Sequence, residues 1–205
     1  MRGVTIVLVG LGFAAIASAQ PAAEDKSRFG VTPNAELYPQ TTPKATLDTA
    51  IKLLEAKRFD YFVAHLVDPA LLEAKILEQA QRLERGVELE FNAKLIEQKR
   101  NPEQVATREK LPVDPVAFAA LVREEAVGRS FKYVVRDLQA QLAEYPENIK
   151  AFRTFLNGGQ FAESGATASV THKDIPGNTL YFKNTGKRWH LEDKQSDDAK
   201  PTTEK

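Results

Sequence analysis

The sequence contains no cysteine. This absence excludes disulfides, thiolate metal ligands and cysteine nucleophiles, and it also excludes the acylated cysteine of a bacterial lipoprotein. Net charge is absent as well, because Lys plus Arg and Asp plus Glu number 28 each. A balanced chain offers no basic field to nucleic acid or to an anionic membrane surface, so we expect no nucleic-acid partner.

Motifs for phosphate, nucleotide or hydrolytic chemistry are also missing from the sequence. There is no Gly-x-Ser-x-Gly, no His-Glu-x-x-His and no glycine-rich phosphate loop after a predicted strand. Gly158 and Gly159 follow a predicted helix, so we interpret them as its end, with glycine where a left-handed residue is needed. The sequence therefore predicts no cofactor.

The first residues have the composition of an export signal. Arg2 precedes an apolar, uncharged run from Val4 to Ala17, and Ala17-Ser18-Ala19 fits the small-x-small cleavage pattern. We predict a signal peptide over residues 1–19, and hence a secreted or periplasmic mature protein. The alternative is an uncleaved membrane anchor, but the run is shorter than the roughly twenty residues of a span. We expect no membrane span in the mature chain.

Two further segments lack the periodicity of folded elements. Residues 20–42 are rich in proline, threonine and alanine, which predicts an extended linker. Residues 194–205 are polar and predict a disordered tail. Between them, residues 43–193 form one predicted domain, because 42% hydrophobic and 27% charged residues suffice for a core.

Helical periodicity fills the first part of this domain. Thr42 and Pro43 predict a helix start, with Thr42 as the cap and Pro43 in the first turn. Asn101-Pro102 interrupts the pattern, and 102–110 predicts a short helix or loop. We expect helices over these stretches: 43–56, 59–66, 69–85, 87–100 after an interruption at Gly86, 116–127, 130–145 and 146–157.

The last part changes to period two. Leu180 and Phe182 alternate with polar residues before an Asn-Thr-Gly turn, and Trp189 and Leu191 alternate after it, which predicts a β-hairpin. A hairpin with one apolar face needs a cover, and the preceding helices supply it. The sequence predicts an α+β fold, with N-terminal helices on one face of a C-terminal antiparallel sheet of three to four strands.

The two ends of this domain resemble a known superfamily. The stretch Thr42–Phe62, followed by Leu66-Val67-Asp68-Pro69, resembles the opening of nuclear transport factor 2-like domains, and Leu180–Asp193 is similar to the last hairpin of their exported bacterial members. The resemblance implies a cone-shaped α+β fold that often dimerises through its sheet. Members include isomerases, dehydratases, small-molecule binders and domains without an assigned role, so fold does not decide function.

One cluster has the residue types of a proton-transfer site. Asp60, Tyr61 and His65 could supply a base, its orienting partner and an oxyanion donor. The alternative is structural, because Asp60 suits a helix cap and His65 suits a helix C-terminus. We favour the structural interpretation and predict no catalytic residue.

The other two histidines raise the question of a metal site. His172 and His190, with Glu192, have metal-binding side chains on neighbouring predicted strands. Their spacing does not require a metal, and the alternating pattern predicts the ordinary solvated face of a meander. We therefore expect no metal.

The absence of a catalytic set, the export signal and the balanced charge favour an exported non-enzymatic domain that binds a partner or has a structural role in the cell envelope. The sequence does not identify this partner. The alternative is a cone-type small-molecule binder, or an enzyme of the isomerase or dehydratase kind, that uses Asp60, Tyr61 and His65.

The only tryptophan provides a direct test of the predicted core. We expect Trp189→Ala to lower the free energy of unfolding by about 3–5 kcal/mol, because it removes the largest apolar side chain of the hairpin. Chemical denaturation measures this loss. A variant that unfolds at the wild-type denaturant concentration would contradict the core assignment.

Overall fold

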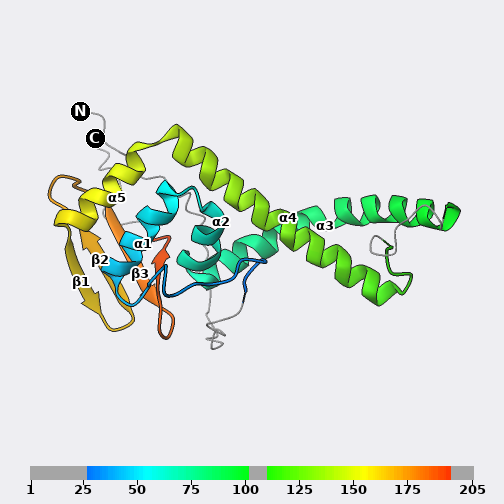
Figure 1. Ribbon diagram of the computed structural model, residues 1–205, viewed down its shortest axis with the longest axis horizontal. Coiled ribbons are helices and arrows are strands. Elements are labelled where there is room, and N and C mark those ends of the chain that lie inside the picture. The colour runs from blue at the N-terminus through cyan, green and yellow to red at the C-terminus, as the bar shows by residue number, and fades with distance from the viewer. Residues whose placement is uncertain (1–26, 102–109, 195–205) are drawn as a thin grey trace, which may run out of the picture. The chain divides into compact units, whose positions relative to one another are not determined.

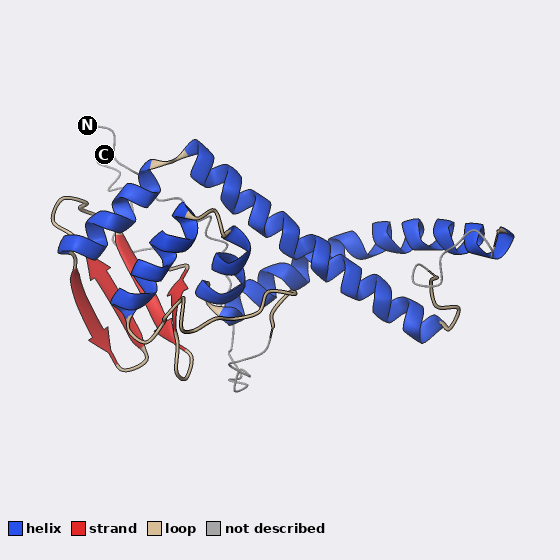
Figure 2. Cartoon of the chain, in the orientation of Figure 1, coloured by secondary structure: helices blue, strands red, loops and turns tan. Residues whose placement is uncertain are grey.

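The computed structural model describes residues 27–101 and 110–194. Its elements confirm the predicted α+β class, with helices first and an antiparallel sheet last (Figures 1 and 2). The described chain divides into two compact units. The sheet unit contains the described residues up to Leu72 and those from Asp137 onward. The second unit, Glu73–Arg136, is called the hairpin unit after its two long helices, and it does not contain the β-hairpin of the sheet. Predictions for residues 1–26, 102–109 and 195–205 lie outside the described residues.

The elements of the sheet unit follow the predicted order closely. Its helices are α1 (Pro43–Glu55), α2 (Phe59–Tyr61), the π-helix η1 (Phe62–Leu66) and α5 (Glu147–Gly158). Its strands are β1 (Gln160–Ser164), β2 (Thr167–Thr171), β3 (Thr179–Asn184) and β4 (Trp189–Glu192). The Thr42 side chain caps α1 by accepting a hydrogen bond of 3.0 Å from the Ala45 amide, as predicted.

The sheet is an antiparallel meander of four strands in the order β1-β2-β3-β4. The hairpin between β3 and β4 turns where it was predicted, and Gly186 has a φ of +108°, a conformation open to glycine. Ala168, Phe182 and Leu191 stand opposite one another on three neighbouring strands. The predicted apolar face is confirmed, because these side chains are buried: Leu180, Phe182, Trp189 and Leu191.

Two helices cover one face of this sheet. Figure 1 shows α1 and α5 side by side in front of the strands, and the two helices contact each other. Leu47 of α1 and Phe155 of α5 are completely buried. The period of apolar residues along each helix therefore points its stripe to the sheet, as binary patterning requires.

The helices of the hairpin unit are longer than predicted. α3 is one helix, Pro69–Arg100, and α4 is one helix, Pro115–Glu144, so the expected breaks at Gly86 and between residues 127 and 130 are wrong. A single glycine costs a helix only about 1 kcal/mol relative to alanine. Packing of the two helices outweighs this cost through a shared cluster of buried residues: Ala80, Val87, Phe91, Val122 and Ala126.

Among the helices of residues 27–101 and 110–194, none is both long enough and apolar enough to cross a membrane. α3 and α4 are long, but charged side chains recur along both.

The end of α5 differs from the prediction in its backbone. Gly159 has a φ of −70° and a ψ of 147°, so the left-handed glycine expected here is wrong. Glycine is needed for another reason. A Cβ on Gly159 would collide with the carbonyl oxygen of Phe155 and lie 2.5 Å from Cγ2 of Val170, because the chain passes directly over β2.

Substitution of the two adjacent glycines separates this steric requirement from helix propensity. We expect Gly159→Ala to lower the free energy of unfolding by about 1–3 kcal/mol, since a backbone carbonyl has to move. In Gly158→Ala the new methyl group would lie 2.7 Å from Nε2 of His172, and we expect a smaller loss, because a side chain can shift more readily than a backbone carbonyl. Urea denaturation of both variants measures the difference, and equal losses would contradict the close approach.

Candidate functional site

The structure brings together two of the three residues considered for a proton-transfer site, Tyr61 and His65, and leaves Asp60 apart. Tyr61 and His65 are buried, and their rings lie 4.7 Å apart. The Asp60 side chain is half-exposed and contacts Arg58 at 3.4 Å. Tyr61 and His65 thus come together, while Asp60 faces solvent beside an arginine instead of orienting the imidazole.

The Tyr61 hydroxyl and the His65 Nε2 are both used to hold backbone. The His65 Nε2–H donates to the Val31 carbonyl at 2.9 Å, since a carbonyl oxygen can only accept. The Tyr61 hydroxyl accepts from the Asn34 amide at 2.8 Å. Both partners belong to the segment 27–42, which was predicted to be an extended linker. In the structure the described part of that segment is attached to the sheet unit by these bonds.

Carbonyl groups at the end of η1 explain why donors gather here. The last carbonyls of any helix lack partners within the helix. Arg28 Nη1 donates to the Ala64 carbonyl at 2.7 Å, and the His65 carbonyl accepts from Gln40 Nε2 at 2.9 Å. His190 Nδ1–H donates to the same His65 carbonyl at 3.1 Å. Side chains distant in the sequence thus act as the C-terminal cap of η1.

Gln40 also closes the outer edge of β4. Its carbonyl accepts from the Trp189 amide at 2.9 Å, and its Nε2 donates to the Trp189 carbonyl at 2.8 Å. Thr46 Oγ1 adds a longer bond of 3.3 Å to that carbonyl. Farther along, Val67 pairs in parallel with Leu191, and the Asp68 amide donates to the Leu191 carbonyl at 2.9 Å.

This closure buries His190, which was predicted to lie on a solvated sheet face. That prediction is wrong: His190 is 6% exposed, against 3% for His65. β4 is an edge strand whose outward face is covered where η1 and the following residues cross it. Lys183 of β3 also contacts the Asp68 carboxylate, at 3.1 Å.

The residues considered for a metal are not brought together. His172 accepts from the Asp174 amide through its Nδ1, while His190 is bonded to the His65 carbonyl. In the part of the chain that the structure describes, no three His, Asp or Glu side chains are grouped as metal ligands.

Burial sets the protonation of the two buried histidines. Desolvation lowers the pKa of His190 to about 4, and it also lowers the pKa of His65. Both imidazoles are therefore neutral at neutral pH, and each donates a hydrogen bond to a backbone carbonyl. Burial likewise raises the pKa of the Tyr61 hydroxyl. This arrangement fixes chain segments.

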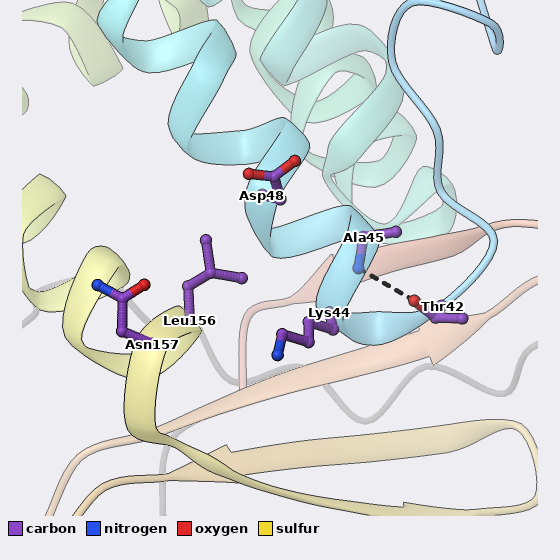
Figure 3. A pocket seen from close by; sticks show the side chains of 6 residues that line it. All are labelled: Thr42, Lys44, Ala45, Asp48, Leu156 and Asn157. Atoms are coloured by element: carbon purple, nitrogen blue, oxygen red, sulfur yellow. Dashed lines mark hydrogen bonds between the residues drawn. The ribbon is translucent and has the colours of Figure 1, made fainter.

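A shallow cleft lies elsewhere in the sheet unit, between the start of α1 and the end of α5 (Figure 3). Its volume is about 470 Å³, and it is lined by Thr42, Lys44, Ala45, Asp48, Leu156 and Asn157. The Asp48 carboxylate is paired with Lys52 at 2.7 Å. Lys44 is the cation among the residues that line the cleft. No pattern in the sequence indicates this cleft, because its two walls are more than a hundred residues apart.

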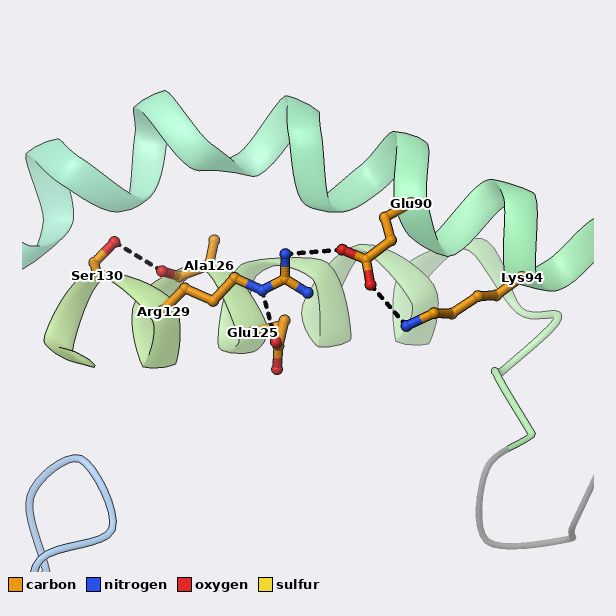
Figure 4. Close-up of polar contacts among 6 residues, drawn as sticks. All are labelled: Glu90, Lys94, Glu125, Ala126, Arg129 and Ser130. Carbon is orange, nitrogen blue, oxygen red and sulfur yellow. Dashed lines mark hydrogen bonds and ion pairs between the residues drawn. The ribbon is translucent and has the colours of Figure 1, made fainter. Parts of the chain in front are cut away.

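The hairpin unit carries a charged cluster across its two helices (Figure 4). Glu90 of α3 accepts from Lys94 at 2.7 Å and from Arg129 of α4 at 2.8 Å, and Arg129 also contacts Glu125 at 2.7 Å. Hydrogen bonds from Arg129, and then from Lys94, lower the pKa of Glu90 to about 2. The stabilising contribution of Glu90 is therefore complete above the ordinary pKa of a glutamate and is lost as the pH falls toward 2.

No family model matches this chain, and neither a curated protein nor a solved structure matches it. The resemblance of the two ends of the domain to nuclear transport factor 2-like domains therefore stays a prediction.

Gln40 provides the test of the closed edge. We expect Gln40→Ala to lower the free energy of unfolding by about 1–3 kcal/mol, because the buried carbonyls of His65 and Trp189 each lose a donor. Gln139→Ala, at an exposed position of α4, is the control and should change stability little. Urea denaturation at neutral pH compares the two, and equal midpoints would show that Gln40 does not hold the edge.

Proposed function

We propose that this protein is an exported, non-enzymatic domain of the cell envelope that binds a partner through its hairpin unit. The observation that carries this proposal is where large apolar side chains are exposed. Of eight such side chains in the described residues, two, Leu37 and Tyr145, lie in the sheet unit. Six lie in the hairpin unit: Leu77, Leu89, Ile96, Val113, Val116 and Tyr133.

The positions of these side chains support a binding surface. Leu89 and Ile96 are seven residues apart on α3, which places them on one side of that helix. Val113 and Val116 are 68% and 78% exposed, and they lie just before and within the first turn of α4. Scattered exposed leucines are normal, but a concentration of apolar side chains in one part of a protein is typical of an interaction site.

The filling of the sheet unit supports a role without catalysis. The aromatic side chains of Phe152, Phe155, Phe182 and Trp189 are buried. They occupy the space between helices and sheet in which a cone-type enzyme would hold its substrate. Two of the residues considered for catalysis, Tyr61 and His65, are buried and bonded to the segment 27–42.

The alternative, a small-molecule binder or an isomerase-like enzyme, would have to use other residues. The cleft of about 470 Å³ between α1 and α5 has the volume of a small-molecule site. Asp60, Tyr61 and His65 do not line it. In this alternative Lys44 and Asn157 would contact the ligand, and a lysine beside a helix N-terminus favours an anionic group.

Site-specific photo-cross-linking tests the hairpin proposal. A photoreactive residue in place of Val116 is expected to cross-link the same partner as one in place of Leu89, while a control at Lys173, an exposed loop position of the sheet unit, does not. These positions are exposed, so the fold should be kept. An adduct of twice the chain mass would identify a second copy as the partner.

Two results would contradict this proposal. One is the same adduct pattern at Val116, Leu89 and Lys173, which indicates nonspecific contact. The other is an adduct at Lys173 alone, which would move the binding surface to the sheet unit. Homodimerisation through the sheet, which the resemblance implies, would appear in that second form.

A further inference from the structure

The segment 27–42 is attached to the sheet unit mainly by polar contacts. Its described residues include one isolated bridge, Arg28 to Val31, and no helix or strand. Gln40 is buried, whereas most other side chains of the segment are half-buried or exposed. A segment that buries little apolar surface opens at a lower cost than the core does, since its hydrogen bonds can be exchanged for water.

Two buried histidines lie at the contacts that hold this segment. His65 binds it directly through the bond from Nε2–H to the Val31 carbonyl. His190 donates to the His65 carbonyl, which also accepts from Gln40 of the segment. Both rings make these bonds in the neutral form, so an added proton places a positive charge in a buried position.

Burial is the main reason why that added charge is unfavourable, and positive neighbours add to it, whereas the bonds to the Val31 and His65 carbonyls favour the charged ring. Arg28 of the segment and Arg188, just before β4, act on both histidines and oppose protonation. Asp68 is the acidic neighbour of His190, and its carboxylate is already engaged by Lys183 and by the Ala70 amide.

Other titratable groups face this site from α2 and from the segment itself. Asp60 favours protonation of His65 but is half-exposed and contacts Arg58. The rings of Tyr38 and Tyr61 lie 4.5 Å apart beside His65, and neither hydroxyl supplies a negative charge at acidic pH.

We propose that residues 27–42 form an acid-released strap: protonation of His65 and His190 detaches the strap from η1 and uncovers the outer edge of β4. The direction of this pH dependence follows from the coupling between proton binding and the attached state. The pKa of His190 is lowered to about 4 in the folded protein, from an ordinary value of 6.5. The attached state is therefore fully favoured above pH 6.5 and loses its advantage as the pH falls from there toward about 4.

Release of the strap would change what the sheet unit presents to its surroundings. The amide and carbonyl of Trp189 are bonded to Gln40 in the attached state. Without Gln40 the Trp189 amide loses its partner and the carbonyl keeps only the longer bond from Thr46. Such an exposed stretch of edge strand is the kind of surface to which another extended chain adds. The strap thus makes access to β4 dependent on pH.

Energy transfer from the single tryptophan measures the position of the strap. Trp189 is the only donor, and the cysteine-free chain allows one label on Thr32→Cys, an exposed strap position. We expect transfer from Trp189 to a dansyl-type acceptor to be lost between pH 6.5 and about 4, while far-ultraviolet circular dichroism stays native. Loss of both signals together would be global unfolding and would overturn the proposal, as would transfer that persists to pH 4.

Matched substitutions identify the titrating groups. His65→Gln keeps a donor at the Nε2 position, and His190→Asn keeps one at the Nδ1 position. The labelled double variant should retain transfer across this pH range, while the control His172→Gln should lose it as wild type does. A double variant that loses transfer at the wild-type pH would overturn the assignment to these histidines. If the double variant does not fold, the wild-type comparison of transfer with circular dichroism still decides the proposal.

Discussion

The closed outer edge of β4 is the constraint on which the sheet unit depends. This strand carries Trp189 and Leu191 into the core, and its outward amide and carbonyl groups would be unpaired without Gln40 and Asp68. Buried backbone polar groups need partners, so the strand that carries the tryptophan needs its edge closed. The segment before α1 and the residues after η1 supply that closure at neutral pH.

The opposite edge of the sheet is managed differently. β1 is mostly exposed, and Glu163 lies opposite Ala168, on the face that carries Phe182. A charged side chain on the inner face of an edge strand opposes edge-to-edge pairing, because pairing would desolvate the carboxylate. One edge is thus covered by the chain itself, and the other is protected by a charge.

The hairpin unit relies on a narrow seam. Its buried cluster consists largely of small or medium side chains around Phe91, and salt bridges such as Glu90 to Arg129 connect the exposed sides of the helices. Exposed ion pairs contribute little to stability in water, so they add specificity of register more than energy. A unit with a thin core and several exposed apolar side chains fits a binding role, since such residues would be buried by a partner.

The sequence by itself determined the class of the fold, because periodicity records which side of each helix or strand faces a core. It located α1, the strands β3 and β4 and the turn at Gly186, and it placed Phe182 and Trp189 inside. Only the tertiary structure decided that helix α3 continues through Gly86 and that His190 is buried. Local pattern carries no information on such outcomes: Gln40 and Trp189 are 149 positions apart. The environment of a residue at a sheet edge is set by whichever distant segment packs there, and so is the protonation of a histidine beneath it.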